Sequence, residues 1–325
     1  MVSFISFLRA IATCLITNAH YTGIYPSDLI ANGGLLGDVI FFAVSGYCLC
    51  DVKKTFFAWY GKRIYRCYLP VVIITVVYLI LGFYRFQDNS FFYWFIYPTY
   101  YHFVASITIL YIPYYFVMRC LKDKIFEVMV AVAIIGVVIY VFVYDKTYYH
   151  VDNVREPFIR FLFFECMLLG AVFRQNYNSQ KNVGNGKWYV FATGTLFLLY
   201  FASKMLFSQK NNLASFQIIN QILIFSLLYC VLKVFSIYNA FFEKMPASIN
   251  GVVVFLSKIT LEIYVVQYVI IDLVKQINLP FPINWFVLTV CIVVVAYMLN
   301  QCCNFVAFIV SKALFVKSKG QIDKV

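Results

Sequence analysis

The sequence predicts an all-α, polytopic membrane protein with about ten transmembrane helices and both termini in the cytoplasm. Composition is the first observation behind this fold class: 63% of the 325 residues are hydrophobic, 12% are charged and the mean hydropathy is +0.82. A soluble domain rarely contains more than about half apolar residues. The second observation is that the apolar residues fall into stretches of about 20, the length that a helix needs to cross a bilayer.

The predicted spans follow one another without a linker, a repeat or a low-complexity tract. We therefore expect a single integral membrane domain over residues 1–325. The first span lacks a preceding basic region and contains an arginine, so it is expected to remain in the mature protein and not to act as a cleaved signal. The spans lie near 4–21, 34–50, 69–84, 100–118, 127–144, 158–174, 187–206, 215–235, 252–274 and 284–311.

The distribution of lysine and arginine predicts the orientation. With the N-terminus in the cytoplasm, eighteen basic residues fall in inner segments and seven in outer ones. Inner loops of membrane proteins carry such an excess. The net charge of +12 therefore indicates membrane orientation and not a nucleic-acid partner, and the expected partner is the lipid bilayer.

The first span, SFISFLRAIATCLITNAHY, carries Arg9 and His20, two groups that are costly inside a membrane. Eleven residues turn a helix to within about 20° of its starting direction and advance it by about 16 Å, so both side chains share one face. Arg9 could instead extend to the inner headgroups, and His20 could be an interfacial histidine without chemistry. Because Arg9 and His20 occur together on one face, we favour a functional interpretation. The arginine could hold an anion and the histidine could transfer a proton, in line across the membrane.

The second span contains Asp38 at its start and Ser45-Gly46 further along. Because no G-x-S-x-G motif surrounds Ser45, we interpret Ser45-Gly46 as a place of close helix packing. The ten cysteines form no C-x-x-C pair, so no metal site is expected.

The loop 51–68 contains Arg63 and Arg66, three residues apart. On a helix they would lie on one side and could hold phosphates bidentately. An orienting role for these charges explains them equally well.

The outer segment 83–103 is rich in aromatic residues, including Trp94, and ends near His102. An aromatic belt at the headgroup level is the ordinary explanation. The alternative is a platform on which sugar rings stack, with Trp94 and His102 binding the substrate.

Several of these segments together resemble the acyltransferase 3 family. The similarity is most specific over residues 4–70, in LRAIATCLITNAH, FFAVSGY and KRIYRCYLP. It continues more loosely in YHFVAS, which contains His102, and in LEIYVVQ, where Gln267 stands in place of the family's histidine. Glutamine can orient a hydroxyl but cannot act as a base.

The resemblance implies an integral membrane enzyme, typically of ten helices, that moves an acyl group from a coenzyme A thioester to a carbohydrate. Arg9 and His20 would be its essential pair, and Arg63 and Arg66 its cytoplasmic arginine motif. Acetyl-CoA is the expected donor, with its phosphates on Arg63, Arg66 and Arg9. His20 would take the proton of the acceptor hydroxyl; an acyl-histidine intermediate is the alternative.

Three further residues complete the expected site. Asp38 would hold the imidazole of His20, and Gln267 would join Trp94 and His102 at the acceptor. We therefore expect an O-acyltransferase, specifically an O-acetyltransferase, of the bacterial plasma membrane that modifies a cell-envelope polysaccharide or its lipid-linked precursor. A glycan transporter or flippase is the alternative from another class; broken helices in corresponding positions of two halves would favour it, and the sequence does not show them. A non-catalytic scaffold would leave Arg9 and His20 unexplained.

Overall fold

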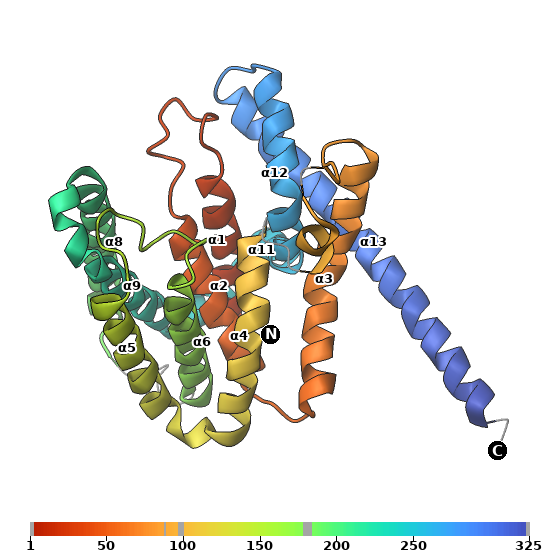
Figure 1. The fold of residues 1–325 in the computed structure, drawn as a ribbon, viewed down its shortest axis with the longest axis horizontal. Coiled ribbons are helices and arrows are strands. Elements are labelled where there is room, and N and C mark those ends of the chain that lie inside the picture. Colours follow the sequence, from red (N-terminus) through yellow and green to blue (C-terminus); the bar gives the residue numbers. More distant parts are fainter. Residues whose placement is uncertain (1–2, 88, 97–100, 178–183, 323–325) are drawn as a thin grey trace.

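The computed structural model describes residues 3–322, except for 88, 97–100 and 178–183, and these residues form helices and connecting segments without a strand (Figure 1). The prediction of an all-α fold is confirmed. The first half contains α1 (Ser3–Ala19), α2 (Gly34–Leu49), α3 (Phe56–Ile80), the π-helix η1 (Phe92–Ile96), α4 (His102–Cys120), the 3-10 helix η2 (Lys122–Lys124), α5 (Ile125–Phe142) and α6 (Ile159–Gln175). The second half contains α8 (Gly186–Gln209), the 3-10 helix η3 (Asn211–Phe216), α9 (Ile218–Ile237), α10 (Asn239–Glu243), α11 (Ala247–Lys258), α12 (Thr260–Gln276) and α13 (Ile283–Ile322).

Helices α1, α2 and α6 form the centre of the bundle, and most of their residues are buried. Two glycines allow α2 and α6 to approach closely. A Cβ on Gly46 would lie 1.9 Å from the Met167 carbonyl oxygen, and one on Gly170 would lie 1.8 Å from the Ala43 carbonyl oxygen. The interpretation of Ser45-Gly46 as a packing site is therefore confirmed.

The surrounding helices are longer and turn apolar side chains outward. In α5 only Ile125, Gly136 and Tyr140 are buried, and in α8 only Tyr200 and Phe207. Six of the described helices are long and apolar enough to cross a membrane, or seven if α11 and α12 count as one span. The protein is thus a multi-pass membrane protein. Helices stand at all ten predicted positions, but α1, α2 and α6 have only 16 or 17 residues, about 25 Å.

Two segments differ from the sequence-based expectation. The stretch assigned to a loop at 51–68 is mostly helical, because α3 already begins at Phe56. The predicted span 252–274 is divided into α11 and α12, which meet at an angle of 73°. Hydropathy revealed neither feature: basic residues lower it over the first turns of α3, and apolar residues continue through the bend between α11 and α12.

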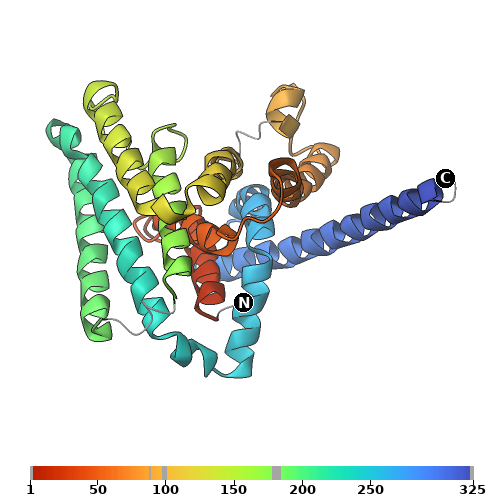
Figure 2. The ribbon, with the colours of Figure 1, turned by 90° about the horizontal axis from the view of Figure 1, so that it is seen from below.

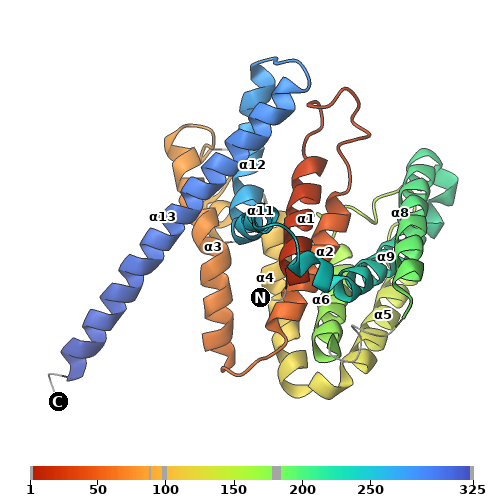
Figure 3. The same ribbon diagram turned by 180° about the vertical axis from the view of Figure 1, so that it is seen from behind.

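The bundle has two ends, each named after the residue of α1 that lies toward it. The Arg9 end is where α1 and α3 begin and where α2 and α6 end, at the bottom of Figure 1 and toward the viewer in Figure 2. The His20 end is where α1 and α12 end and where α2 begins. Helix α13 packs on α12 and α3 and then runs away from the bundle (Figure 3).

Candidate active site along α1 and α12

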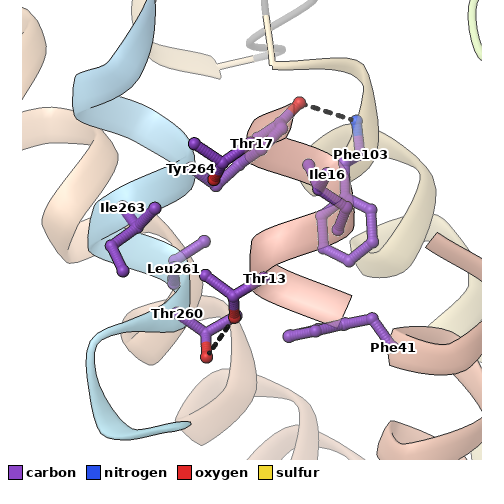
Figure 4. A pocket seen from close by; sticks show the side chains of 9 residues that line it. All are labelled: Thr13, Ile16, Thr17, Phe41, Phe103, Thr260, Leu261, Ile263 and Tyr264. Atoms are coloured by element: carbon purple, nitrogen blue, oxygen red, sulfur yellow. Dashed lines mark hydrogen bonds between the residues drawn. The ribbon is translucent and has the colours of Figure 1, made fainter. Parts of the chain in front are cut away.

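A small pocket lies beside α1 between the levels of Arg9 and His20 (Figure 4). Helix α1 contributes Thr13, Ile16 and Thr17, and the rest of the lining comes from α12, α2 and α4: Thr260, Leu261, Ile263, Tyr264, Phe41 and Phe103. The lining is mainly apolar with a few hydroxyl groups. Such a composition suits a thin, weakly polar chain and excludes charged groups.

Two hydrogen bonds bracket this pocket, as Figure 4 shows. At one side the hydroxyls of Thr13 and Thr260 are 3.0 Å apart. At the other side the backbone N–H of Phe103 donates to the Tyr264 hydroxyl at 3.4 Å. The break between α11 and α12 falls at Ile259, so it places Thr260 opposite Thr13 at the first turn of α12.

Helices α1 and α12 run in the same direction. Residues equally far beyond the pocket on the two helices therefore lie at about the same height in the bundle. Thr13 and Thr260 are hydrogen-bonded to each other. The residue seven positions after Thr13 is His20, and the residue seven positions after Thr260 is Gln267. Seven residues are two turns, about 10 Å, and return to nearly the same face. An observed contact agrees with this register: the His20 ring lies edge-on to the Tyr268 ring, with 4.9 Å between centroids.

His20 lies in the turn that follows α1, which ends at Ala19. Its backbone N–H donates to the Thr17 carbonyl at 3.1 Å. Tyr268 in turn contacts the ring of Tyr101, whose hydroxyl donates to the Val265 carbonyl at 3.1 Å. The imidazole is therefore half-buried and positioned by tyrosines from α12 and from the residue before α4.

Two polar groups near the pocket have no hydrogen-bond partner in the part of the chain that the structure describes. The Gln267 side chain is 0% exposed, and both its amide nitrogen and its amide oxygen lack partners. The Thr17 hydroxyl, which lines the pocket, also lacks one. Because an unpaired buried polar group costs about 1–3 kcal/mol, these groups are suited to hydrogen-bond a bound substrate.

The three arginines of the sequence prediction lie at the Arg9 end. Arg63 and Arg66 lie in the first half of α3, and Arg9 lies in the first half of α1. Arg63 also lies over the Trp59 ring, 4.5 Å from its centroid, and its Nη1 donates to the Trp59 carbonyl at 3.2 Å. Arg66 is exposed on the same helix. The structure therefore places all three arginines toward the end of the bundle at which α1 and α3 begin.

Asp38 is buried, but it is not paired with His20. Among the described residues no hydrogen bond or ion pair joins them. The physical reason is the antiparallel packing of α1 and α2, in which Gly34 meets Ala19 and Gly37 meets Ile16. Asp38 consequently lies beside the pocket and about a turn below the imidazole.

The expected acceptor residues His102 and Trp94 stand at the His20 end, but in different settings. His102 is half-buried at the start of α4. Trp94 in η1 is only 4% exposed and stacks on Tyr84, with ring centroids 4.5 Å apart. One face of the Trp94 ring is thus already covered. Part of the aromatic segment, residues 88 and 97–100, lies outside the described residues.

Sequence reasoning missed Thr13, Thr17, Thr260, Tyr264 and Tyr268. One signal was present: Tyr264 and Tyr268 are four apart and flank Gln267, so a helix places all three on one side. The threonines carried no comparable signal, because Ser and Thr occur throughout membrane helices.

The fold and the site define a multi-pass membrane protein in which an arginine and a histidine flank a narrow pocket. The chain belongs to the acyltransferase 3 family: a family model described as an acyltransferase domain (Acyl_transf_3) matches residues 2–301. It is therefore a membrane acyltransferase. No curated protein and no solved structure matches the chain.

Proposed function

We propose that the protein is an O-acetyltransferase of the bacterial plasma membrane that transfers the acyl group of acetyl-CoA to a hydroxyl of a cell-envelope glycan. We propose further that the Arg9 end faces the cytoplasm, in keeping with the eighteen-to-seven distribution of basic residues. Donor and acceptor would then reach the pocket from opposite sides of the membrane.

The observation that carries this proposal is the place of the pocket between Arg9 and His20. The two residues are separated by about 16 Å along α1, a distance that the pantetheine arm of coenzyme A can largely cover. Its phosphates would stay with the arginines, because a multiply charged group cannot enter a hydrocarbon layer about 30 Å thick unaided. The apolar lining is chemically suited to the uncharged arm and not to the nucleotide, and the pocket would have to widen to admit the arm.

His20 is the group that can move the proton. Its imidazole would accept the proton of the acceptor hydroxyl while the oxygen attacks the thioester carbonyl, and the carbon–sulfur bond would then break to release the thiolate, which takes up a proton. Gln267, at the same level, can donate its amide N–H to a substrate oxygen. Tyr268 holds the imidazole from the side.

Sealed vesicles of both orientations test the proposal. With membrane-impermeant acetyl-CoA and an impermeant glycan acceptor, transfer is expected only when the two are on opposite faces. Transfer with both substrates on the Arg9 face alone would contradict the transmembrane route. Mass analysis of surface glycans with and without the protein should show an acetyl increment; its absence would contradict the acceptor class.

One observation favours the second candidate, a glycan transporter. Transporters place broken helices at their binding sites, and α11 and α12 form such a break beside the pocket. No second break of this kind occurs among the described residues, whereas inverted repeats would supply one in each half. Movement of glycan across vesicles in the absence of any acyl donor would favour the transporter.

A further inference from the structure

Lys233 is a buried cation in the last two turns of α9, toward the Arg9 end. Only 4% of the residue is exposed. Its Nζ lies 5.9 Å from the centroid of the Tyr189 ring in α8 and 6.0 Å from that of the Phe173 ring in α6. Tyr229, one turn before Lys233, packs against both rings, with centroids 6.4 and 5.7 Å away. Three helices therefore surround this ammonium group with aromatic rings.

No carboxylate of these helices neutralises Lys233. Helices α8 and α9 contain no acidic residue. The acidic residue of α6, Glu165, precedes Phe173 by eight positions, which is about 12 Å along the helix. Glu243 in α10 accepts a hydrogen bond from Asn239 at 2.7 Å. In the described part of the chain, Lys233 forms neither an ion pair nor a hydrogen bond.

The aromatic rings do not offset the cost of burying this charge. A cation above an aromatic ring gains about 0.5–2 kcal/mol, and about 6 Å from the centroid is the outer limit of the contact. Taking an ammonium group out of water costs several kcal/mol even after the protein has relaxed. The difference favours an anion bound beside the Nζ of Lys233.

A second polar group lies on the same side of α9. The hydroxyl of Ser236, a residue that is 3% exposed, has no hydrogen-bond partner among the described residues. Ser236 follows Lys233 by three positions, so the helix places their Cβ atoms about 5–6 Å apart. An ammonium group and a hydroxyl that are both free to donate can together bind the oxygens of a phosphate.

The surroundings of Lys233 favour a lipid as the source of this phosphate. Helix α8 lies at the edge of the bundle (Figure 1), and Trp188 and Phe191 in its first two turns are 62% and 64% exposed. Tryptophan is enriched at the headgroup level of a membrane. Because Trp188 adjoins Tyr189, which contacts Lys233, the lysine lies near that level. Basic sites between helices on the cytoplasmic side bind anionic headgroups.

We infer that Lys233 and Ser236 bind the phosphate of an anionic phospholipid of the cytoplasmic leaflet, between α6, α8 and α9. The inference goes beyond the proposed function and takes from it only that the Arg9 end faces the cytoplasm. The headgroup neutralises Lys233 and connects α8 to its neighbours. Helix α8 gains from this connection, because none of its residues before Tyr200 is buried. A free phosphate ion has the same chemistry and is separated by the experiment.

Lipid binding is measured on the purified protein in an uncharged detergent, to which phosphatidylglycerol, phosphatidylcholine or inorganic phosphate is added. Phosphatidylglycerol should raise Tm, because a ligand that binds only the folded protein stabilises it. It should also remain bound in native mass spectra. Phosphatidylcholine and inorganic phosphate should do neither at the same concentration.

Substitutions at Lys233 assign the effect. Lys233→Met should lower the apparent affinity for phosphatidylglycerol by about tenfold or more, the loss expected for one hydrogen bond to a charged group, and Lys233→Arg should keep most of it. Without anionic lipid, Lys233→Met should raise Tm, because an uncompensated buried charge is removed.

Two further variants complete the set. Ser236→Ala should weaken the affinity by about two- to tenfold, the loss of one neutral hydrogen bond, and should leave Tm without lipid unchanged. Lys187→Met is the matched control, because Lys187 carries the same charge at the start of α8 but is exposed. It should change neither the affinity nor Tm.

Several outcomes would overturn the inference. Equal stabilisation by the two lipids, or an unchanged affinity in Lys233→Met, would do so. A lower Tm of Lys233→Met without lipid would make the lysine a structural residue, and an equal effect of inorganic phosphate would assign the site to a free ion. Acetyl transfer on the same samples separates the two proposals: transfer without a preference for phosphatidylglycerol contradicts only this inference, and the preference without transfer contradicts only the proposed function.

Discussion

Replacing Gln267 by methionine should make the protein more stable and less active. Methionine has a similar length and no hydrogen-bonding amide. Gln267 is 0% exposed, and its amide nitrogen and oxygen lack partners among the described residues. Removal of a buried unpaired group of this kind is expected to raise the free energy of unfolding by about 1–3 kcal/mol. For a chain of this size that corresponds to roughly 1.5–4.5 °C in Tm.

The expected loss of activity follows from the same geometry. Gln267 stands at the level of His20, two turns beyond the bonded threonines. If its amide forms a hydrogen bond to the substrate in the transition state, removing the amide should raise the free energy of activation by about 0.5–1.5 kcal/mol. The corresponding loss in kcat/KM is up to about tenfold. Transfer of labelled acetyl groups by the purified protein and thermal unfolding in detergent measure the two quantities on one sample.

Asn300→Leu is the matched control, because Asn300 is a bonded amide. Its Nδ2 donates to the buried Glu262 carboxylate at 2.8 Å. Loss of this donor should lower Tm, since Glu262 would lose a partner. A Gln267→Met protein that unfolds at lower temperature and retains full activity would refute the reasoning, because the amide would then be bonded for structural reasons alone.

Three further changes test the site and the fold. His20→Ala should reduce transfer by about 10²–10⁴-fold at unchanged membrane abundance, because the imidazole moves a proton and is not a core residue; substantial residual activity would exclude it as the base. Arg66→Lys should raise KM for acetyl-CoA more than Arg63→Lys does, because Arg63 is partly engaged by Trp59; equal and normal KM values would reduce both to orienting charges. Gly170→Ala should destabilise the bundle by more than about 3 kcal/mol, since its Cβ would lie 1.8 Å from a carbonyl oxygen, whereas Gly136→Ala meets only ordinary 3.8 Å contacts and should unfold near the wild-type temperature.

The sequence by itself determined the helices and the first pair of candidate functional residues. In a membrane, each segment must satisfy its own backbone hydrogen bonds, so a run of apolar residues predicts a helix without knowledge of its neighbours. The spacing of Arg9 and His20 is likewise local to one segment. For the same reason Arg63 and Arg66 could be placed on one side of a helix, although hydropathy put the start of that helix too late.

Only the tertiary structure decided which helices lie together. Lipid tails are as apolar as the helix surfaces, so hydrophobicity does not specify which helices pack together. Close contacts between small or polar residues specify it instead. The approach of α2 to α6 depends on Gly46 and Gly170, and the register of α1 with α12 on the bond between Thr13 and Thr260. These contacts place Gln267 level with His20. The packing that brings Arg174 over the Tyr47 ring joins residues more than a hundred positions apart, and no local pattern records it.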